Sequence, residues 1–74
     1  MDESLKQRVL HLFVVMGEDA LDLHTLFEAG GNDRAEREEV VDIVAKLVSD
    51  GFLEERGSDY YALTETGREA LRRQ

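Results

Sequence analysis

The segment from Asp33 to Gly67 limits the fold more than any other part of the chain. Its first half carries apolar residues at helical spacing and ends at Gly51, and glycine commonly terminates helices because it adopts the left-handed backbone conformation. Two short runs of apolar and polar residues follow, separated by the turn Gly57-Ser58-Asp59. This order predicts a helix, a β-hairpin and the start of another helix.

The helix in this segment has a defined start and a defined buried face. Asp33 and Glu36 form a capping-box pattern, so the helix is predicted to begin at Arg34. Ile43 lies at the edge of the apolar stripe, where its spacing is compatible with burial or exposure. The residues predicted to be buried share one face of the helix: Val40, Val41, Val44, Leu47 and Val48.

The N-terminal part predicts another amphipathic helix, beginning at Ser4 and ending at Gly17. Ser4 and Gln7 form a second capping-box pattern. Leu10 and Val14, with Val15, widen the apolar stripe, which indicates either burial on two sides or a dimer or partner face. The stripe itself consists of Leu5, Val9, Leu12, Phe13 and Met16.

Two shorter helices complete the prediction. Asp22 is a good N-cap for a helix that ends at Ala29, before the turn Gly30-Gly31-Asn32. Thr64 is predicted to cap the last helix. In these two helices we expect the apolar residues to face inward, namely Leu23, Leu26, Phe27, Ala70 and Leu71. The residues expected to face solvent are Arg68, Arg72 and Arg73.

One set of residues resembles a pattern of winged helix-turn-helix proteins: Leu47, Gly51-Phe52-Leu53, Tyr61, Leu63-Thr64, Gly67 and Leu71. In the MarR, PadR and ArsR types of transcription regulator, a leucine and a Gly-Leu-Ile step precede Tyr-x-Leu-Thr-x-x-Gly-x-x-x-Leu. The resemblance implies a mainly α fold with a small β-hairpin, the wing (class α+β). Its order is helix, short strand, helix, helix, strand, strand, helix. It also implies that Leu21 lies in the short strand and pairs with the wing.

Composition sets further limits. The 74 residues suffice for one small domain, 1–74, with a modest core. The chain has no cysteine, which excludes disulfides and thiolate metal sites. No apolar run is long enough to span a membrane, and the acidic start Met1-Asp2-Glu3 lacks a signal-peptide core. We therefore expect a cytoplasmic protein without a membrane partner.

The distribution of charge bears directly on DNA binding. The net charge is −8, and residues 18–33 carry five acidic and no basic side chains. DNA binding draws on lysines and arginines that neutralise phosphates, whereas carboxylates near phosphates are repelled. The candidate interface residues on the third helix are Arg34, Arg37, Glu38, Glu39, Asp42 and Lys46, and those on the wing are Arg56, Gly57, Ser58 and Asp59.

This charge pattern favours a small regulatory or adaptor module that acts through a protein–protein interface or self-association. An acidic helix face with Ile43 exposed at its edge would bind a basic partner. The same face is also explained as a solvated surface that keeps a small protein soluble. The alternative function is a DNA-binding transcription regulator of winged-helix type. We expect that regulator to be dimeric, because one module buries little surface.

Signals of catalysis or cofactor binding are weak. The sequence has no phosphate-binding glycine loop and no supported Ser/His/Asp arrangement. His24 and Glu28 lie four residues apart, but two ligands on one helix do not complete a metal site. Short helices and a hairpin offer little concavity for a substrate. We expect no enzymatic activity, metal, cofactor or small-molecule substrate.

Overall fold

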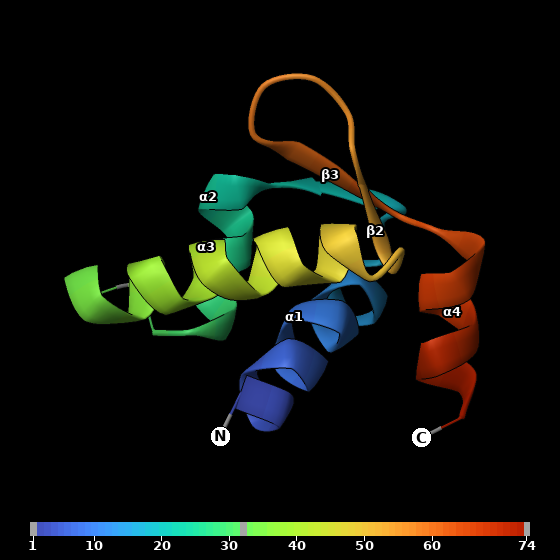
Figure 1. The fold of residues 1–74 in the computed structure, drawn as a ribbon, viewed down its shortest axis with the longest axis horizontal. Coiled ribbons are helices and arrows are strands. Elements are labelled where there is room, and N and C mark those ends of the chain that lie inside the picture. Colours follow the sequence, from blue (N-terminus) through green and yellow to red (C-terminus); the bar gives the residue numbers. More distant parts are fainter. Residues whose placement is uncertain (1, 32, 74) are drawn as a thin grey trace.

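Four α-helices, one 3₁₀ helix and a three-stranded sheet make up the part of the chain that the computed structural model describes, residues 2–31 and 33–73 (Figure 1). The fold is therefore α+β, and the predicted order of elements is confirmed. The elements are α1 (Asp2–Met16), β1 (Ala20–Asp22), α2 (Leu23–Leu26), η1 (Phe27–Ala29), α3 (Arg34–Ser49), β2 (Leu53–Glu55), β3 (Tyr60–Leu63) and α4 (Glu65–Arg72).

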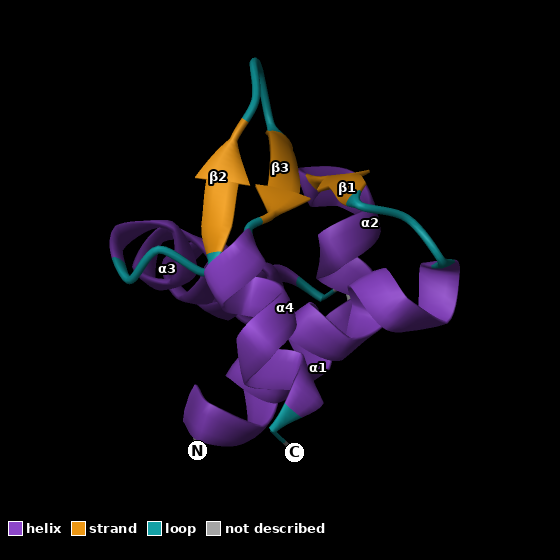
Figure 2. Ribbon diagram, turned by 90° about the vertical axis from the view of Figure 1, so that its right-hand side faces the viewer, coloured by secondary structure: helices purple, strands orange, loops and turns teal. Residues whose placement is uncertain are grey.

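The sheet is antiparallel in the order β1-β3-β2, so β3 pairs with both neighbours. Leu21 of β1 lies opposite Tyr61, and Leu53 of β2 lies opposite Leu63. These pairs confirm that Leu21 lies in a strand that pairs with the hairpin. Figure 2 shows the sheet above the helices, with the β2–β3 hairpin projecting away from them.

One contiguous core fills the space between α1, α3 and the sheet. Val9, Leu26, Val40 and Leu47 have no exposed surface. The other buried hydrophobic residues that pack in this core are Leu5, Leu10, Phe13, Leu21, Ile43, Val44 and Leu53. Their aliphatic surface provides the hydrophobic stabilisation that a domain of this size requires.

The helix ends follow the sequence signals closely. Backbone N–H groups of Thr25 and Glu36 donate to the carboxylates of Asp22 (3.1 Å) and Asp33 (3.0 Å), which confirms both N-caps. The predicted stops at Gly17 and Gly51 are also confirmed, and both glycines have positive φ angles of 68° and 88°. At each helix end, the N–H groups of the glycine and of the residue after it donate the paired hydrogen bonds of a Schellman motif.

The base of the hairpin is closed by Thr64, which we predicted as the cap of the last helix. The Thr64 hydroxyl donates to the Gly51 carbonyl oxygen at 2.6 Å, and it accepts from the Gly67 backbone N–H at 3.0 Å. A Cβ atom at Gly67 would collide with the Phe52 carbonyl oxygen and lie 2.7 Å from Leu63 Cδ1. A glycine is therefore needed where α4 crosses the start of β2.

Two predicted details of α1 are wrong. The helix begins at Asp2, so Ser4 lies inside it and is not its N-cap. Met16, predicted to be buried, is 49% exposed because it lies at the end of the helix. The rest of the predicted stripe is buried or half-buried.

The buried face of α3 is rotated relative to the prediction. Ile43 is 5% exposed, whereas Val41 is 43% exposed. Because α3 packs against both α1 and β2, its buried stripe runs through Val40, Ile43, Val44 and Leu47. The interpretation that Ile43 forms an exposed contact is therefore wrong, and Val41 occupies the exposed apolar position.

Candidate functional site

The exposed face of α3 carries all six side chains that the sequence nominated. Three of them, Arg37, Glu38 and Asp42, surround Val41 and line a hollow of about 290 Å³ with it. Arg34 and Lys46 lie near opposite ends of the helix, separated along its axis by about 18 Å at 1.5 Å per residue. Glu39 is exposed as well. The six nominated side chains are three basic and three acidic, and around the exposed Val41 two carboxylates lie with one arginine.

Several arginines lie next to carboxylates of the same chain. Arg56 Nη2 is 3.6 Å from Glu54 Oε1 on the hairpin, and Arg68 Nη1 is 3.1 Å from Asp19 Oδ1. Arg72 and Arg73 both approach Glu69, at 3.5 and 3.9 Å. These ion pairs are exposed and so contribute little to stability. They do, however, partly cancel the positive charge that a polyanion would meet.

Arg37 makes a different kind of contact. Its guanidinium carbon lies 5.4 Å from the centre of the Phe27 ring, which is within the range of a cation–π interaction. The Phe27 ring also meets the His24 ring edge-on, with 6.2 Å between centroids. Phe27 therefore connects the N-terminal half of α3 with α2.

The hairpin turn is held by its backbone. Gly57 and Asp59 have positive φ angles of 79° and 57°, and the Arg56 N–H donates to the Tyr60 carbonyl oxygen at 2.7 Å. The Leu23 N–H donates to the Asp59 carbonyl oxygen, also at 2.7 Å. The turn is thereby fixed to the start of α2. All four nominated wing residues, Arg56, Gly57, Ser58 and Asp59, are exposed.

A second hollow, of about 370 Å³, lies between α2 and this turn. Ser58 and Asp59 were candidates from the sequence, whereas the other polar and aromatic side chains around the hollow were not. The pairing of β1 with β3 sets Asp22 opposite Tyr60 and so creates this site. The polar and aromatic residues that line the hollow are Asp22, His24, Phe27, Ser58, Asp59 and Tyr60.

The electrostatics of this region favour positive charge. Hydrogen bonds from the Thr25 side chain and backbone N–H lower the pKa of the Asp22 carboxyl below its ordinary value, so it stays ionised. Burial raises the pKa of Tyr61 above its ordinary value, and the negative charges of Glu55 and Asp59 raise it further. The ionised Asp22, together with the negative charges of Glu55 and Asp59, gives this region negative charge near neutral pH.

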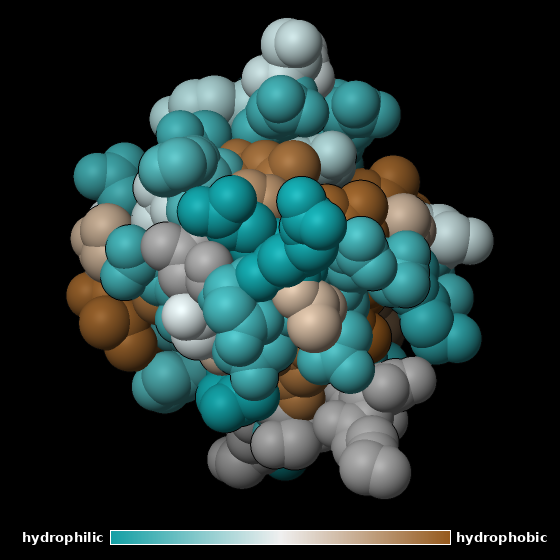
Figure 3. Space-filling view, turned by 90° about the vertical axis from the view of Figure 1, so that its left-hand side faces the viewer, coloured by the Kyte–Doolittle hydropathy of each residue, from teal (hydrophilic) through white to brown (hydrophobic). Residues whose placement is uncertain are grey.

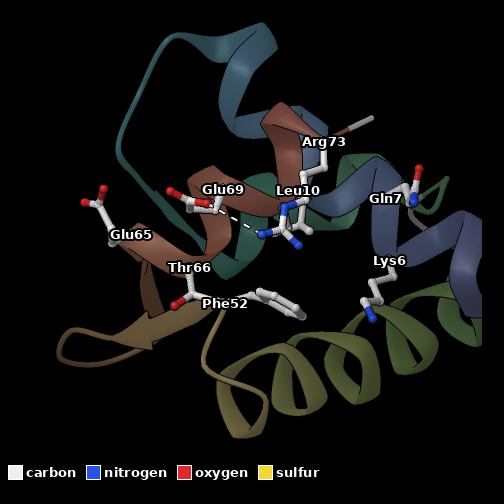
Figure 4. A pocket seen from close by; sticks show the side chains of 9 residues that line it. Lys6, Gln7, Leu10, Phe52, Glu65, Thr66, Glu69 and Arg73 are labelled. Atoms are coloured by element: carbon white, nitrogen blue, oxygen red, sulfur yellow. Dashed lines mark ion pairs between the residues drawn. The ribbon is translucent and has the colours of Figure 1, made fainter.

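A third hollow, of about 640 Å³, separates α1 from α4 (Figure 4). The Lys6 ammonium lies 5.3 Å from the centre of the Phe52 ring, and Arg73 pairs with Glu69 four residues earlier, on the α4 side of the hollow. Charges of both signs therefore line this hollow, and they indicate no single class of ligand. Leu10, at its floor, is only 2% exposed.

The proposed dimer face on α1 consequently loses one of its two residues. Leu10 belongs to the core because α4 packs over this side of α1, while Val14 is 57% exposed. Val15 is also exposed, at 66%. The face seen in Figure 3 is mainly hydrophilic, with small separate hydrophobic areas.

Within residues 2–31 and 33–73, no three or more His, Cys, Asp or Glu side chains are grouped so as to hold a metal ion. In the same part of the chain, no helix combines the length and the apolar character needed to cross a membrane.

Comparison with known proteins gives no assignment: no family model, curated protein or solved structure matches the chain. The resemblance to winged helix-turn-helix regulators therefore remains a prediction from the sequence pattern. Any functional proposal must rest on the two hollows beside α3 and α2, the charges around them and the order of the elements.

Proposed function

We propose that this chain is a winged-helix interaction module that binds a basic protein segment through the exposed face of α3. The order of helices and strands and the closure of the hairpin by Thr64 support the winged-helix assignment. The observation that carries the functional proposal is the position of Val41. Its side chain is 43% exposed and shares a hollow with Glu38 and Asp42.

The composition of this face suits a protein partner. Protein interfaces commonly combine an apolar centre with a polar rim, and complementary charges select the partner. Val41 supplies the apolar centre, and beside it the two carboxylates of Glu38 and Asp42 outnumber the single positive charge of Arg37. A basic amphipathic segment has the matching properties. Its apolar side chains would cover Val41, and its lysines or arginines would meet the carboxylates.

The same face is poorly suited to duplex DNA. Affinity for DNA depends on cations that neutralise phosphates. Each uncompensated carboxylate at the interface repels the phosphates and weakens binding. On α3 the carboxylates of Glu38, Glu39 and Asp42 lie among the basic side chains. On the hairpin, Arg56 is already paired with Glu54.

A direct test compares two probes at low ionic strength. We expect no binding of the protein to random duplex DNA, whereas a capped basic amphipathic peptide should shift the backbone amide NMR signals of residues 37–46. The variant Val41→Ser should weaken the peptide interaction. Because Val41 is exposed, we expect the thermal unfolding of this variant to match that of the original protein. DNA binding that weakens steeply with salt, without any peptide effect at α3, would overturn the proposal.

A charge variant makes the test sharper. Changing Glu38, Glu39 and Asp42 to Gln, Gln and Asn should create weak nonspecific DNA binding if these carboxylates prevent it. The matched control changes the same number of exposed carboxylates elsewhere: Glu18→Gln, Asp50→Asn and Glu65→Gln. Equal DNA binding by both variants would show that net charge alone, and not the α3 face, determines the result.

A further inference from the structure

We propose that the hollow between α2 and the hairpin turn binds the guanidinium group of an arginine side chain from the partner. This inference rests on the proposed function, because it names a side chain of the basic segment that α3 would bind. The hollow measures about 370 Å³ and opens between two elements that are hydrogen-bonded to each other.

The lining of the hollow has the chemistry that a guanidinium requires. Asp22 and Asp59 contribute carboxylates, and Phe27 and Tyr60 contribute aromatic rings. Arginine combines a planar cation, which stacks on aromatic rings, with several N–H donors, which bind carboxylates. Among the described residues around the hollow, none is a lysine or an arginine. A phosphate or other anion would therefore meet repulsion there.

The Asp22 carboxylate and the backbone of Asp59 are held in place before any ligand binds. Asp22 accepts a hydrogen bond from the Thr25 N–H at 3.1 Å, which fixes its side chain at the start of α2. Asp59 lies in the left-handed backbone region, and its carbonyl oxygen accepts from the Leu23 N–H. The two elements are therefore joined at the hollow itself. This arrangement lowers the entropic cost of forming the site on binding.

The molecule already contains one example of the proposed contact. The Arg37 guanidinium lies over the Phe27 ring, the same ring that lines the hollow. Arg37 also lines the hollow around Val41 on α3. The two hollows therefore adjoin through the Phe27–Arg37 contact. A basic segment that covers Val41 can thus extend toward α2 and place an arginine between Asp22 and Asp59.

The experiment uses the full chain and a defined probe, the capped tripeptide N-acetyl-Gly-Arg-Gly-amide. We expect this peptide to cause saturable shifts of the amide NMR signals of residues 22–27 and 58–60. The same peptide with Gln in place of Arg should leave those signals unmoved at equal concentration. Equal shifts with both peptides, or shifts confined to other residues, would overturn the arginine site.

Two variants test the assigned side chains. Asp59→Asn removes the charge but retains a residue that tolerates positive φ, and Tyr60→Leu removes the ring from an exposed position. Each should weaken binding of the arginine peptide by about threefold, as expected for an exposed ionic or cation–π contact. The control Asp50→Asn makes the same charge change away from the hollow and should have no effect. Unchanged affinity in both Asp59→Asn and Tyr60→Leu would contradict the assignment.

The arginine site and the proposed function can fail separately. If the amphipathic peptide shifts α3 signals but no arginine peptide affects residues 22–27 and 58–60, the arginine site is wrong and the interaction module stands. If the arginine tripeptide binds at α2 while the amphipathic peptide leaves α3 unaffected, the α3 interface is wrong and the arginine site stands.

Discussion

The two ends of the β2–β3 hairpin are held in different ways. At its base, the Thr64 hydroxyl binds the Gly51 carbonyl oxygen, and Gly67 packs against the Phe52 carbonyl oxygen. At its tip, residues 56–60 are exposed, and they are held by backbone hydrogen bonds and by the exposed ion pair of Arg56 with Glu54. A side-chain hydrogen bond and the close packing of Gly67 therefore fix the base, whereas the tip depends on its backbone conformation.

This difference separates the residues that determine the fold from those available to a partner. Substitutions at the base should lower the free energy of unfolding, because they create cavities or clashes in packed structure. Substitutions of exposed side chains near the tip should leave stability almost unchanged and alter binding alone. Stability measurements on variants of both regions can test this separation directly.

The largest effect should come from Leu47→Ala at the C-terminal end of α3, next to the hairpin base. Leu47 has no exposed surface, and its backbone carbonyl accepts a hydrogen bond from the Phe52 N–H at 2.9 Å. We expect a loss of about 2–5 kcal/mol in the free energy of unfolding, measured by urea denaturation. The control Val41→Ala, on the exposed face, should change it by less than about 0.5 kcal/mol. An unchanged midpoint for Leu47→Ala would refute the core assignment.

A smaller loss should follow from Gly67→Ala in α4. In an unobstructed helix, alanine in place of glycine stabilises by about 1 kcal/mol. Here the added Cβ would collide with the Phe52 carbonyl oxygen and crowd Leu63, so we expect a net loss of about 1–3 kcal/mol by thermal or urea unfolding. The sign of the change in the free energy of unfolding shows whether the collision or the helix propensity of alanine dominates. A stabilised variant would mean that α4 does not pack against the hairpin base as closely as described.

The local signals in the sequence predicted most of the fold because they act over short distances. The caps at Asp22, Asp33 and Thr64 each bind a backbone N–H three residues later, and Gly17 and Gly51 end their helices through their own backbone. Each of these features depends on four to six neighbouring residues. A single sequence contains that information directly.

Features that depend on distant segments were predicted poorly. Val41 was wrongly assigned to the buried face of α3 and Ile43 was left open between burial and exposure, because the choice depends on how α1 and β2 pack against the helix. Leu10 was left open between burial by the chain itself and a partner contact, and it is buried in a structure where α4, from the other end of the chain, packs against α1. The hollow at α2 was missed because it exists only when β1 pairs with β3. Candidate sites made by such pairings need the three-dimensional structure.

The smallest effect that still separates tip from base concerns the backbone of Asp59, whose φ angle is 57°. Alanine is strained in this conformation, so Asp59→Ala should lower the free energy of unfolding by about 1 kcal/mol. Asn and Gly adopt it more readily, so Asp59→Asn and Asp59→Gly should lie closer to the original protein in urea denaturation. If the backbone conformation holds the tip, the Asp59→Gly and Asp59→Asn variants should both have a higher free energy of unfolding than Asp59→Ala, although all three lack the charge. If Asn were as destabilising as Ala, the Asp59 carboxylate itself would hold the tip. That carboxylate would then be a structural group as well as the proposed contact for arginine.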